Sequence, residues 1–224
     1  MFRSDADYVY ICMNNTIYGT VYHEIPDTGD IPLIADISSC FLSEPIDVTK
    51  FAMLYGGAQK NVAPAGLTIC IIREDMLGNA RDITPTMLNY KIHADANSLY
   101  NTPPCYTIYI CKLVLEWIEK LGGLKKMKER NDKKAKLLYD FLDESQLFKG
   151  TVEKRDRSLM NVPFVTGSEE MDAKFIKEAK EAGFVNLKGH RTVGGMRASI
   201  YNAMPEEGVA KLVEFMREFE RKNS

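Results

Sequence analysis

Two short apolar runs, residues 51–55 and 67–72, are separated by a glycine-rich turn that carries a single lysine, Lys60. Apolar runs of this length, bounded by glycine and proline, are typical of buried strands. The turn reads GGAQKNVAPAG, and its glycines allow a backbone to approach a bound group closely. A lysine held there forms a Schiff base with an aldehyde cofactor if its amine is partly desolvated and deprotonated. The alternative is a surface loop with a solvated lysine.

Two further apolar runs, residues 8–13 and 31–37, precede this pair. A continuous apolar run indicates a strand buried on both faces, as in a mostly parallel sheet. The linkers between the first three runs are too short for long helices. We therefore expect an α/β fold in which these strands form one flank of a larger mixed sheet.

The chain after residue 101 predicts mainly helices. Thr102 is a natural N-cap, and the prolines after it suit a first helical turn. The helix to about residue 121 is apolar almost all round, so we expect it to be buried between layers or domains. The other predicted elements are helices at 124–145, 168–182 (capped by Ser168) and 205–221, and short strands at 160–165, 184–187 and 196–201. Residues 122–224 thus predict a small α+β domain, attached by the long helix to residues 1–121.

Composition excludes several classes of protein. The 224 residues are 45% hydrophobic and 27% charged, which suits a globular chain with a sizeable core. The net charge of −2 does not favour binding to nucleic acid or to an anionic membrane. The five cysteines lie in apolar segments without CxxC or Cys/His spacing, so we expect buried reduced thiols, no metal site and a cytoplasmic protein. No signal peptide and no membrane span are predicted.

Three polar residues follow successive apolar strands, namely Thr16, Asp36 and Lys60. Ligands of open α/β sheets bind beyond the carboxyl ends of the strands. An acid after one strand and a lysine after another form the pair that a pyridoxal phosphate enzyme needs, since the carboxylate pairs with the pyridine nitrogen and the lysine holds the aldehyde. Alternatively, Asp36 is a turn residue beside Ser38, and Thr16 is a strand-end hydroxyl without a role.

Two further segments could bind anions. Asn101 and Thr102 stand at a predicted helix N-terminus, where free N–H groups favour a phosphate. His190, Arg191 and Arg197 lie in or beside a glycine-rich loop, and arginine forks bind carboxylate and phosphate. The alternatives are simple helix capping and a solvated basic loop.

Four blocks of sequence carry a family resemblance: ADISS around Asp36, YGGAQKNVAPAGLT around Lys60, NTPP at Asn101, and KGHRTVGGMRASIYNAMPEEGV over residues 188–209. They closely resemble the phosphoserine aminotransferases over essentially the whole chain. That family consists of fold-type-I enzymes that use pyridoxal 5'-phosphate, with glutamate as amino donor. The resemblance implies that residues 1–121 are the C-terminal part of the large cofactor-binding domain.

The resemblance also implies roles for individual residues. Lys60 would carry the cofactor aldehyde and act as the catalytic acid and base. Asp36 would pair with the pyridine nitrogen, Thr16 would lie near the phenolic oxygen, and Gln59 would reach the phosphate.

The remaining implied roles concern the partner subunit and the substrate. Asn101 and Thr102 would reach the phosphate of the partner subunit's cofactor in a homodimer. Arg197 would hold the substrate α-carboxylate, and His190 and Arg191 would line the pocket for its distal anion. The implied reaction is ping-pong transamination between glutamate and 3-phosphohydroxypyruvate, giving 2-oxoglutarate and phosphoserine. In some bacteria the family also serves vitamin B6 (pyridoxine) synthesis.

One departure from the family qualifies these expectations. The chain lacks roughly the family's first third or more, which ordinarily supplies the first strands, a backbone turn around the phosphate, an aromatic residue stacked on the cofactor and a substrate arginine. We therefore hypothesise that the chain is inactive alone, which detectable transamination by the pure chain would contradict. The alternatives are a non-catalytic fragment or subunit that binds a partner chain, and a related enzyme acting on a different amino acid.

Overall fold

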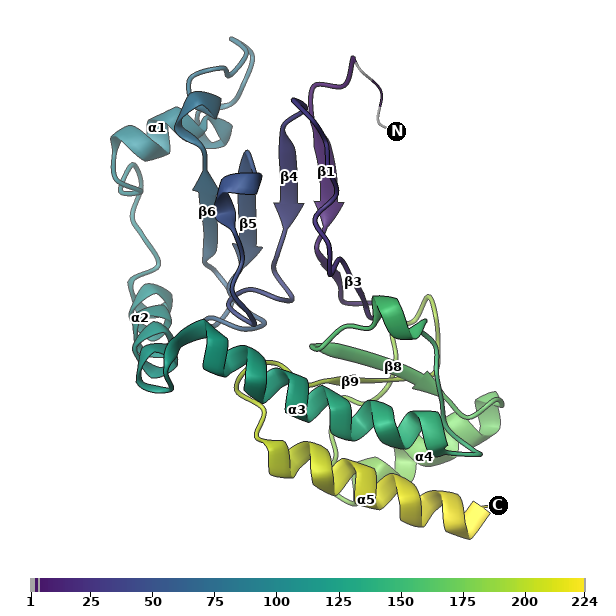
Figure 1. Ribbon diagram of the computed structural model, residues 1–224. Coiled ribbons are helices and arrows are strands. Elements are labelled where there is room, and N and C mark those ends of the chain that lie inside the picture. Colours follow the sequence, from purple (N-terminus) through teal and green to yellow (C-terminus); the bar gives the residue numbers. More distant parts are fainter. Residues whose placement is uncertain (1–2, 4, 224) are drawn as a thin grey trace.

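The computed structural model describes residue 3 and residues 5–223. Its first sheet has the strand order β1-β4-β5-β6 (Figure 1). These strands are β1 (Val9–Cys12), β4 (Leu33–Asp36), β5 (Met53–Gly57) and β6 (Thr68–Ile72). β1, β4 and β5 are parallel, whereas β6 is antiparallel to β5. All four predicted strands are confirmed, and the sheet is mixed as expected.

The two faces of the first sheet differ in burial. Leu33, Ala35 and Leu54 point to the buried face, where they form a hydrophobic cluster. On the other face, Asp36 is half-buried and Tyr10 is 51% exposed. The expectation of strands buried on both faces is therefore wrong for this chain, because no described element covers the Tyr10 end of that face.

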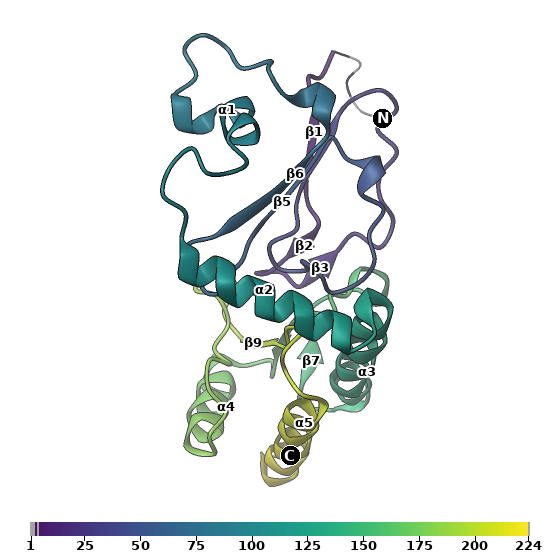
Figure 2. The same ribbon diagram turned by 90° about the vertical axis from the view of Figure 1, so that its left-hand side faces the viewer.

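A second sheet and three helices form a separate layer, here called the C-terminal layer (Figures 1 and 2). It contains α3 (Gly123–Glu144), β7 (Lys149–Gly150), β8 (Asn161–Val165), α4 (Glu169–Glu181), β9 (Met196–Ser199) and α5 (Glu206–Asn223). The strands are antiparallel in the order β7-β8-β9. Phe148, Phe164 and Phe175 are fully buried and pack edge to face at the centre of its core.

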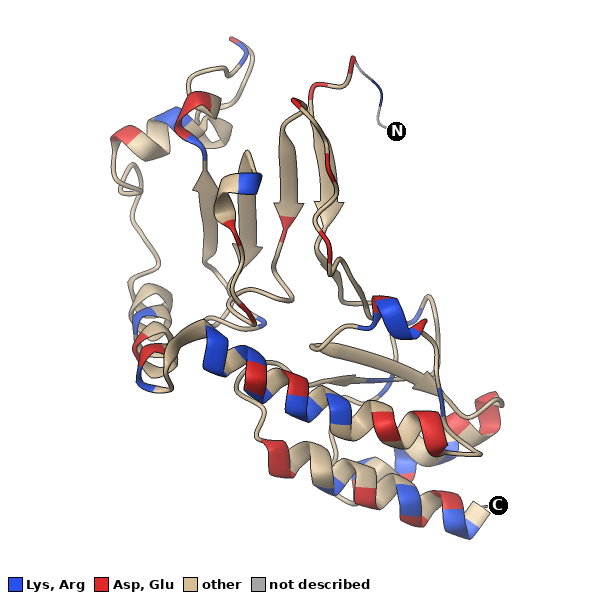
Figure 3. Cartoon of the chain, viewed as in Figure 1, with Lys and Arg blue, Asp and Glu red and all other residues tan. Residues whose placement is uncertain are grey.

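Further elements connect these parts, and all of them except α2 are short. They are β2 (Asn14–Asn15), β3 (Thr20–Val21), α1 (Tyr90–Asp95), α2 (Cys105–Lys120) and the 3-10 turns η1 (Val48–Lys50), η2 (Glu74–Met76), η3 (Thr86–Leu88) and η4 (Lys154–Asp156). Charged residues lie mainly on the helices and connections (Figure 3). Within the four described strands of the first sheet, Asp36 is the one charged residue.

The start of α2 corrects one prediction. Its N-cap is Pro104, with no side-chain capping bond, so Thr102 is not the cap. A residue that precedes proline is disfavoured in the helical region, and both Thr102 and Pro103 precede prolines. The helix therefore begins only at Cys105. By contrast, the predicted Ser168 cap is confirmed, since its hydroxyl accepts from the Met171 N–H (3.2 Å).

The burial of α2 corrects a second prediction. Its buried residues are Thr107, Cys111 and Ile118, whereas Tyr106 is 70% and Tyr109 56% exposed. Figure 2 shows that α2 runs along the outside, past one end of the first sheet, instead of between two layers. An apolar sequence predicts a surface that needs covering, and within the described residues one side of this helix is left uncovered.

Two smaller expectations also fail. Residues 184–187 form no strand, because the turn after α4 closes with a bond from the Phe184 N–H to the Ala179 carbonyl (2.8 Å) and leaves only an isolated bridge at Lys188. All five cysteines are free thiols, but Cys70 and Cys105 are exposed instead of buried. In the described part of the chain, no helix is both long enough and apolar enough to cross a membrane.

Candidate active site

The loop that carries Lys60 is held tightly by its neighbours. Ala58 and Val62 are buried, and the Val62 N–H donates to the Ala58 carbonyl (3.0 Å), closing one helical turn around Lys60. A Cβ atom on Gly57 would lie 2.7 Å from the end of the Gln59 side chain, so a larger residue there would displace that side chain. Gln59 itself is exposed, and Lys60 is half-buried.

Lys60 and Thr16 meet, although 44 residues separate them. The Lys60 Nζ donates to the Thr16 Oγ1 at 2.7 Å. Thr16 is presented by a turn in which the Asn15 side chain accepts from the N–H groups of Ile17 and Tyr18 (3.0 and 3.1 Å). The structure therefore brings together two of the three residues predicted to follow successive strands.

Asp36 stands at the carboxyl end of β4, between Cys12 of β1 and Tyr55 of β5 in the strand register. Its Oδ1 accepts from the Ser38 N–H (2.7 Å), so Asp36 also serves as a turn residue, as the alternative held. The pKa of Tyr55 is raised, mainly by its hydrogen bond with the Tyr10 hydroxyl (2.8 Å), then by burial and by the Asp36 charge. Burial first, and then the Asp36 charge, raise the pKa of the Cys12 thiol. Asp36 thus lies in a partly desolvated row of side chains.

Arg197 reaches the same place from the C-terminal layer. It lies on β9, and its Nη1 donates to the Thr16 carbonyl oxygen (3.2 Å). Its Nε is buried and has no hydrogen-bond partner among the described residues. A buried donor without an acceptor suits a bound anion, because leaving it unpaired is costly. Thr16 is therefore the point at which Lys60 and Arg197 converge.

The glycine-rich loop lies next to this point. A pocket of about 490 Å³ is lined by Ile17, Val193 and Gly194 among others, and none of the predicted site residues lines it. His190 is half-buried, and its Nδ1 is hydrogen-bonded to the Thr192 hydroxyl (2.8 Å), whereas Arg191 is exposed. No hydrogen bond among the described residues joins these two side chains to Lys60.

The remaining predicted residues stand apart. Asn101 and Thr102 are exposed in the segment between α1 and α2, where the Asn101 side chain contacts the Thr102 carbonyl (3.4 Å). The structure brings neither of them into hydrogen-bond contact with Lys60 or Asp36, in so far as the described residues show.

Buried asparagines at the junction between the two sheets are the residues that sequence reasoning missed. Asn14 donates to Ser39 (2.7 Å) and to Asn161 (2.9 Å), and Asn202 donates to Asn61 (3.0 Å). Asparagine within or beside an apolar run was a signal that could have drawn attention to these positions, since a buried amide needs partners.

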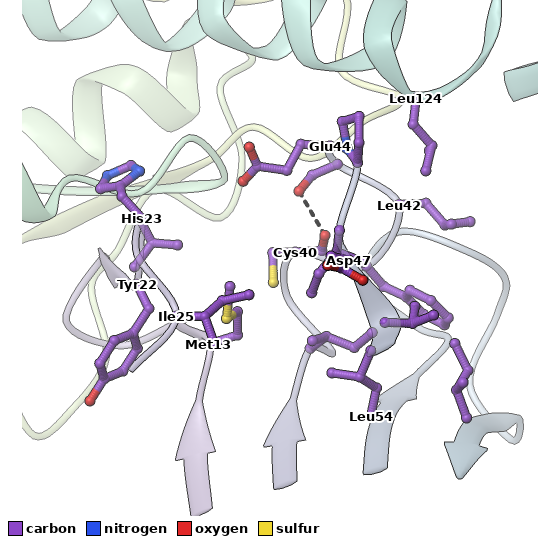
Figure 4. A pocket seen from close by; sticks show the side chains of 18 residues that line it. Met13, Tyr22, His23, Ile25, Cys40, Leu42, Glu44, Asp47, Leu54 and Leu124 are labelled. Carbon is purple, nitrogen blue, oxygen red and sulfur yellow. Dashed lines mark hydrogen bonds between the residues drawn. The ribbon is translucent and has the colours of Figure 1, made fainter. Parts of the chain in front are cut away.

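A second cavity, of about 300 Å³, lies on the face of the first sheet that bears Leu54, opposite the face that bears Asp36 (Figure 4). Its walls are mostly apolar, including Met13, Leu54 and Leu124, with Glu44 and His23 at the side. None of the predicted site residues lines it. Within the described residues, no group of three or more His, Cys, Asp or Glu side chains is placed to hold a metal ion.

Comparison with known proteins shows the family of the chain. Residues 1–212 match the aminotransferase class-V family, and the chain belongs to that family. Within it, the chain is similar to phosphoserine aminotransferases: that of Bacillus cereus is 58% identical over 97% of this chain, and the chloroplastic phosphoserine aminotransferase 2 of Arabidopsis thaliana is 56% identical over 99%.

Solved structures show the same relationship. The phosphoserine aminotransferase from Bacillus circulans subsp. alkalophilus superimposes with a TM-score of 0.97 at 46% identity, covering 100% of this chain and 62% of that chain. The PLP-bound phosphoserine aminotransferase from Trichomonas vaginalis gives 0.92 at 40% identity, covering 97% and 62%. The fold is therefore that of fold-type-I transferases, as expected. The chain spans 60% of the length of the Bacillus cereus relative and 53% of that of the Arabidopsis relative.

Proposed function

We propose that this chain is part of a pyridoxal 5'-phosphate-dependent phosphoserine aminotransferase. The observation that carries the proposal is the convergence of Lys60 and Arg197 on Thr16, close to the strand end that bears Asp36. A solved relative with this fold is PLP-bound, and the residues present suit that cofactor. They supply an amine, a carboxylate and an unpaired buried arginine donor.

Each residue has a distinct task in the proposal. When bound, the cofactor supplies an electron sink for the amino-acid substrate. Lys60 would hold the cofactor at its aldehyde group, and its Nζ would carry the proton that transamination moves. Asp36 would pair with the pyridine nitrogen. Thr16 orients the phenolic side of the ring, and Gln59 reaches the phosphate.

Substrate recognition falls to the C-terminal layer. Arg197 binds the α-carboxylate through its guanidinium, and His190 with Arg191 binds the second anionic group. We propose glutamate and 3-phosphohydroxypyruvate as substrates, with 2-oxoglutarate and phosphoserine as products. The contact of Arg197 with the Thr16 carbonyl oxygen supports this assignment, because the Thr16 hydroxyl binds Lys60.

The proposed assembly is a cytoplasmic homodimer, in which Asn101 and Thr102 contribute to the partner subunit's site. The exposure of these two residues and the exposed face of α2 support it. The proposed division of the chain is residues 1–121 in the cofactor domain and residues 122–224 in a small α+β domain, in line with the two hydrophobic clusters.

The test is a titration of the pure chain with pyridoxal 5'-phosphate, followed by borohydride reduction and peptide mapping. We expect a visible absorption band and a reduced label on Lys60. The variant Lys60→Ala should lose both, whereas the matched control Lys50→Ala should keep them, because Lys50 is exposed on η1. A label on any other lysine would contradict the proposal.

A non-catalytic subunit that binds a partner chain is the second candidate. The half-exposed sheet face around Tyr10 and the exposed apolar side of α2 favour it. Under this candidate, the pure chain shows no transamination between glutamate and 3-phosphohydroxypyruvate. No absorption band in the wild-type titration would favour this candidate.

A further inference from the structure

Asn202 binds both segments that carry the candidate site. It is fully buried where the chain leaves β9 for α5. Its Nδ2 donates to the carbonyl oxygens of residues 42 and 41 (3.1 and 3.4 Å), in the turn that follows Asp36. Its backbone N–H donates to the Oδ1 of Asn61 (3.0 Å), the residue directly after Lys60.

The turn at residues 41–43 needs such support. Leu42 has a φ of +57°, in the left-handed region that residues other than glycine and asparagine rarely adopt. The carbonyl oxygens of all three residues of the turn accept hydrogen bonds from two buried asparagines, because Asn131 donates to the Ser43 carbonyl (3.0 Å). Asn131 also donates to the Asn202 Oδ1 (2.9 Å).

The segment that contains Asn202 is itself anchored on α3. Asn131 and Lys134 are three residues apart on one face of that helix, and both are fully buried. The Lys134 Nζ donates to the carbonyl oxygens of Ile200 (3.0 Å) and Tyr201 (2.7 Å). Arg197 lies on β9, and the two residues between this strand and Asn202 are therefore fixed to α3.

We propose that Asn202 is a positioning residue of the candidate active site. It holds the turn after Asp36 and the loop of Lys60 at set places against the strand of Arg197. A buried amide network of this kind specifies one arrangement, because any shift leaves several buried polar groups unpaired. The inference rests on the proposed function, which gives these three side chains their roles.

Hydrogen exchange of the full chain, without cofactor, tests the clamp. In Asn202→Ala we expect about tenfold faster exchange of the Ser43 N–H, since the side chain that binds the carbonyl oxygens of residues 41 and 42 is lost. The backbone N–H of residue 202 still binds Asn61 in this variant, so Val62 and Ala63 should stay protected. In Asn61→Ala, a milder variant, only Val62, Ala63 and the Asn202 N–H should exchange faster, while Ser43 stays protected.

The matched control is Ser145→Ala. Ser145 is also buried, and its hydroxyl accepts from the Phe148 N–H (2.8 Å), but it lies at the far end of α3. Rates are compared at equal global stability. The proposal is wrong if the Ser43 N–H exchanges as slowly in Asn202→Ala as in Ser145→Ala, or if Asn61→Ala leaves the exchange of Val62 and Ala63 unchanged. Should Asn202→Ala not fold, the second comparison decides alone.

A second measurement separates positioning from mere stability. The rate at which the Lys60 amine reacts with acetic anhydride is measured by mass spectrometry, with exposed Lys50 as internal reference. We expect a rise of about tenfold for Lys60 in Asn61→Ala, which removes the contact between residue 202 and the Lys60 loop, and none in Ser145→Ala, because a loosened loop loses the Thr16 bond. Faster exchange with unchanged Lys60 reactivity would make Asn202 a structural residue only. Neither assay uses the cofactor, so failure of the clamp leaves the proposed function standing, and failure of cofactor binding leaves the clamp standing.

Discussion

At the scale of single residues, Thr16 makes one contact through its side chain and another through its backbone. Its hydroxyl accepts from the Lys60 amine, and its carbonyl oxygen accepts from Arg197. The Thr16 side chain therefore binds Lys60, whereas the Thr16 backbone binds Arg197 of the C-terminal layer. This separation allows the two contacts to be tested apart.

We predict that Thr16→Val disturbs Lys60 but not Arg197. Valine keeps the shape of threonine without the acceptor, so the chain should lose roughly 1 kcal/mol in free energy of unfolding. The Lys60 amine should react several-fold faster, while the Thr16 carbonyl still binds Arg197. Urea unfolding and mass-spectrometric labelling measure the two effects. Thr20→Val, at a half-buried position on β3, is the control and should leave Lys60 unchanged.

At the scale of elements, α3 combines a charged outer face with buried polar groups. Its exposed lysines pair with acids one turn away, as Lys136 does with Asp140 (2.7 Å). Such exposed pairs contribute little to stability. Lys134 is different, because it is fully buried and binds two carbonyl oxygens at the end of β9. The helix therefore stabilises the junction through its inner face.

Lys134 leads to a prediction about pH. Burial, with a smaller effect from Arg130, lowers its pKa from the ordinary 10.5 to about 8. Between these two values the unfolded chain binds more protons than the folded chain, so the free energy of unfolding should rise with pH across that window. Lys134→Met should remove this contribution from the slope. Urea unfolding at a series of pH values measures it, with Lys136→Met as the exposed control. An identical slope in Lys134→Met and wild type would contradict the assignment.

At the scale of the whole molecule, the exposed side of α2 stands out. Tyr106, Tyr109 and Leu113 are 70%, 56% and 40% exposed, and their spacing places them along one side of the helix. Contiguous exposed apolar surface favours association between proteins. In the proposed homodimer, this side of α2 would be covered by the second copy.

We predict that Tyr109→Lys combined with Leu113→Lys weakens self-association of the chain. Placing two charges in an apolar contact should raise the protein concentration at which half of the dimer dissociates by at least about tenfold. Sedimentation velocity over a concentration series would measure this concentration. Val185→Lys combined with Met204→Lys changes exposed apolar residues of the C-terminal layer equally and serves as control. If both pairs shift this concentration alike, α2 is not the interface.

Much of the local structure and part of the site could be predicted from sequence. The four apolar runs became the strands of the first sheet, and the polar residues after them include Thr16 and Lys60, which meet. Parallel strands place their carboxyl ends at one edge, so strand order along the chain was enough to bring these groups close. The burial of α2 was wrongly predicted because apolar composition does not say whether a covering element is present.

The sequence by itself therefore determined most of the segments that become strands and helices, because those features depend on neighbouring residues. Tertiary structure alone decided how the C-terminal layer meets the first sheet. Asn202 and Asn61 are separated by 141 residues, and Arg197 and Thr16 by 181. Such contacts depend on the packing of the two layers, which no local pattern in the chain encodes.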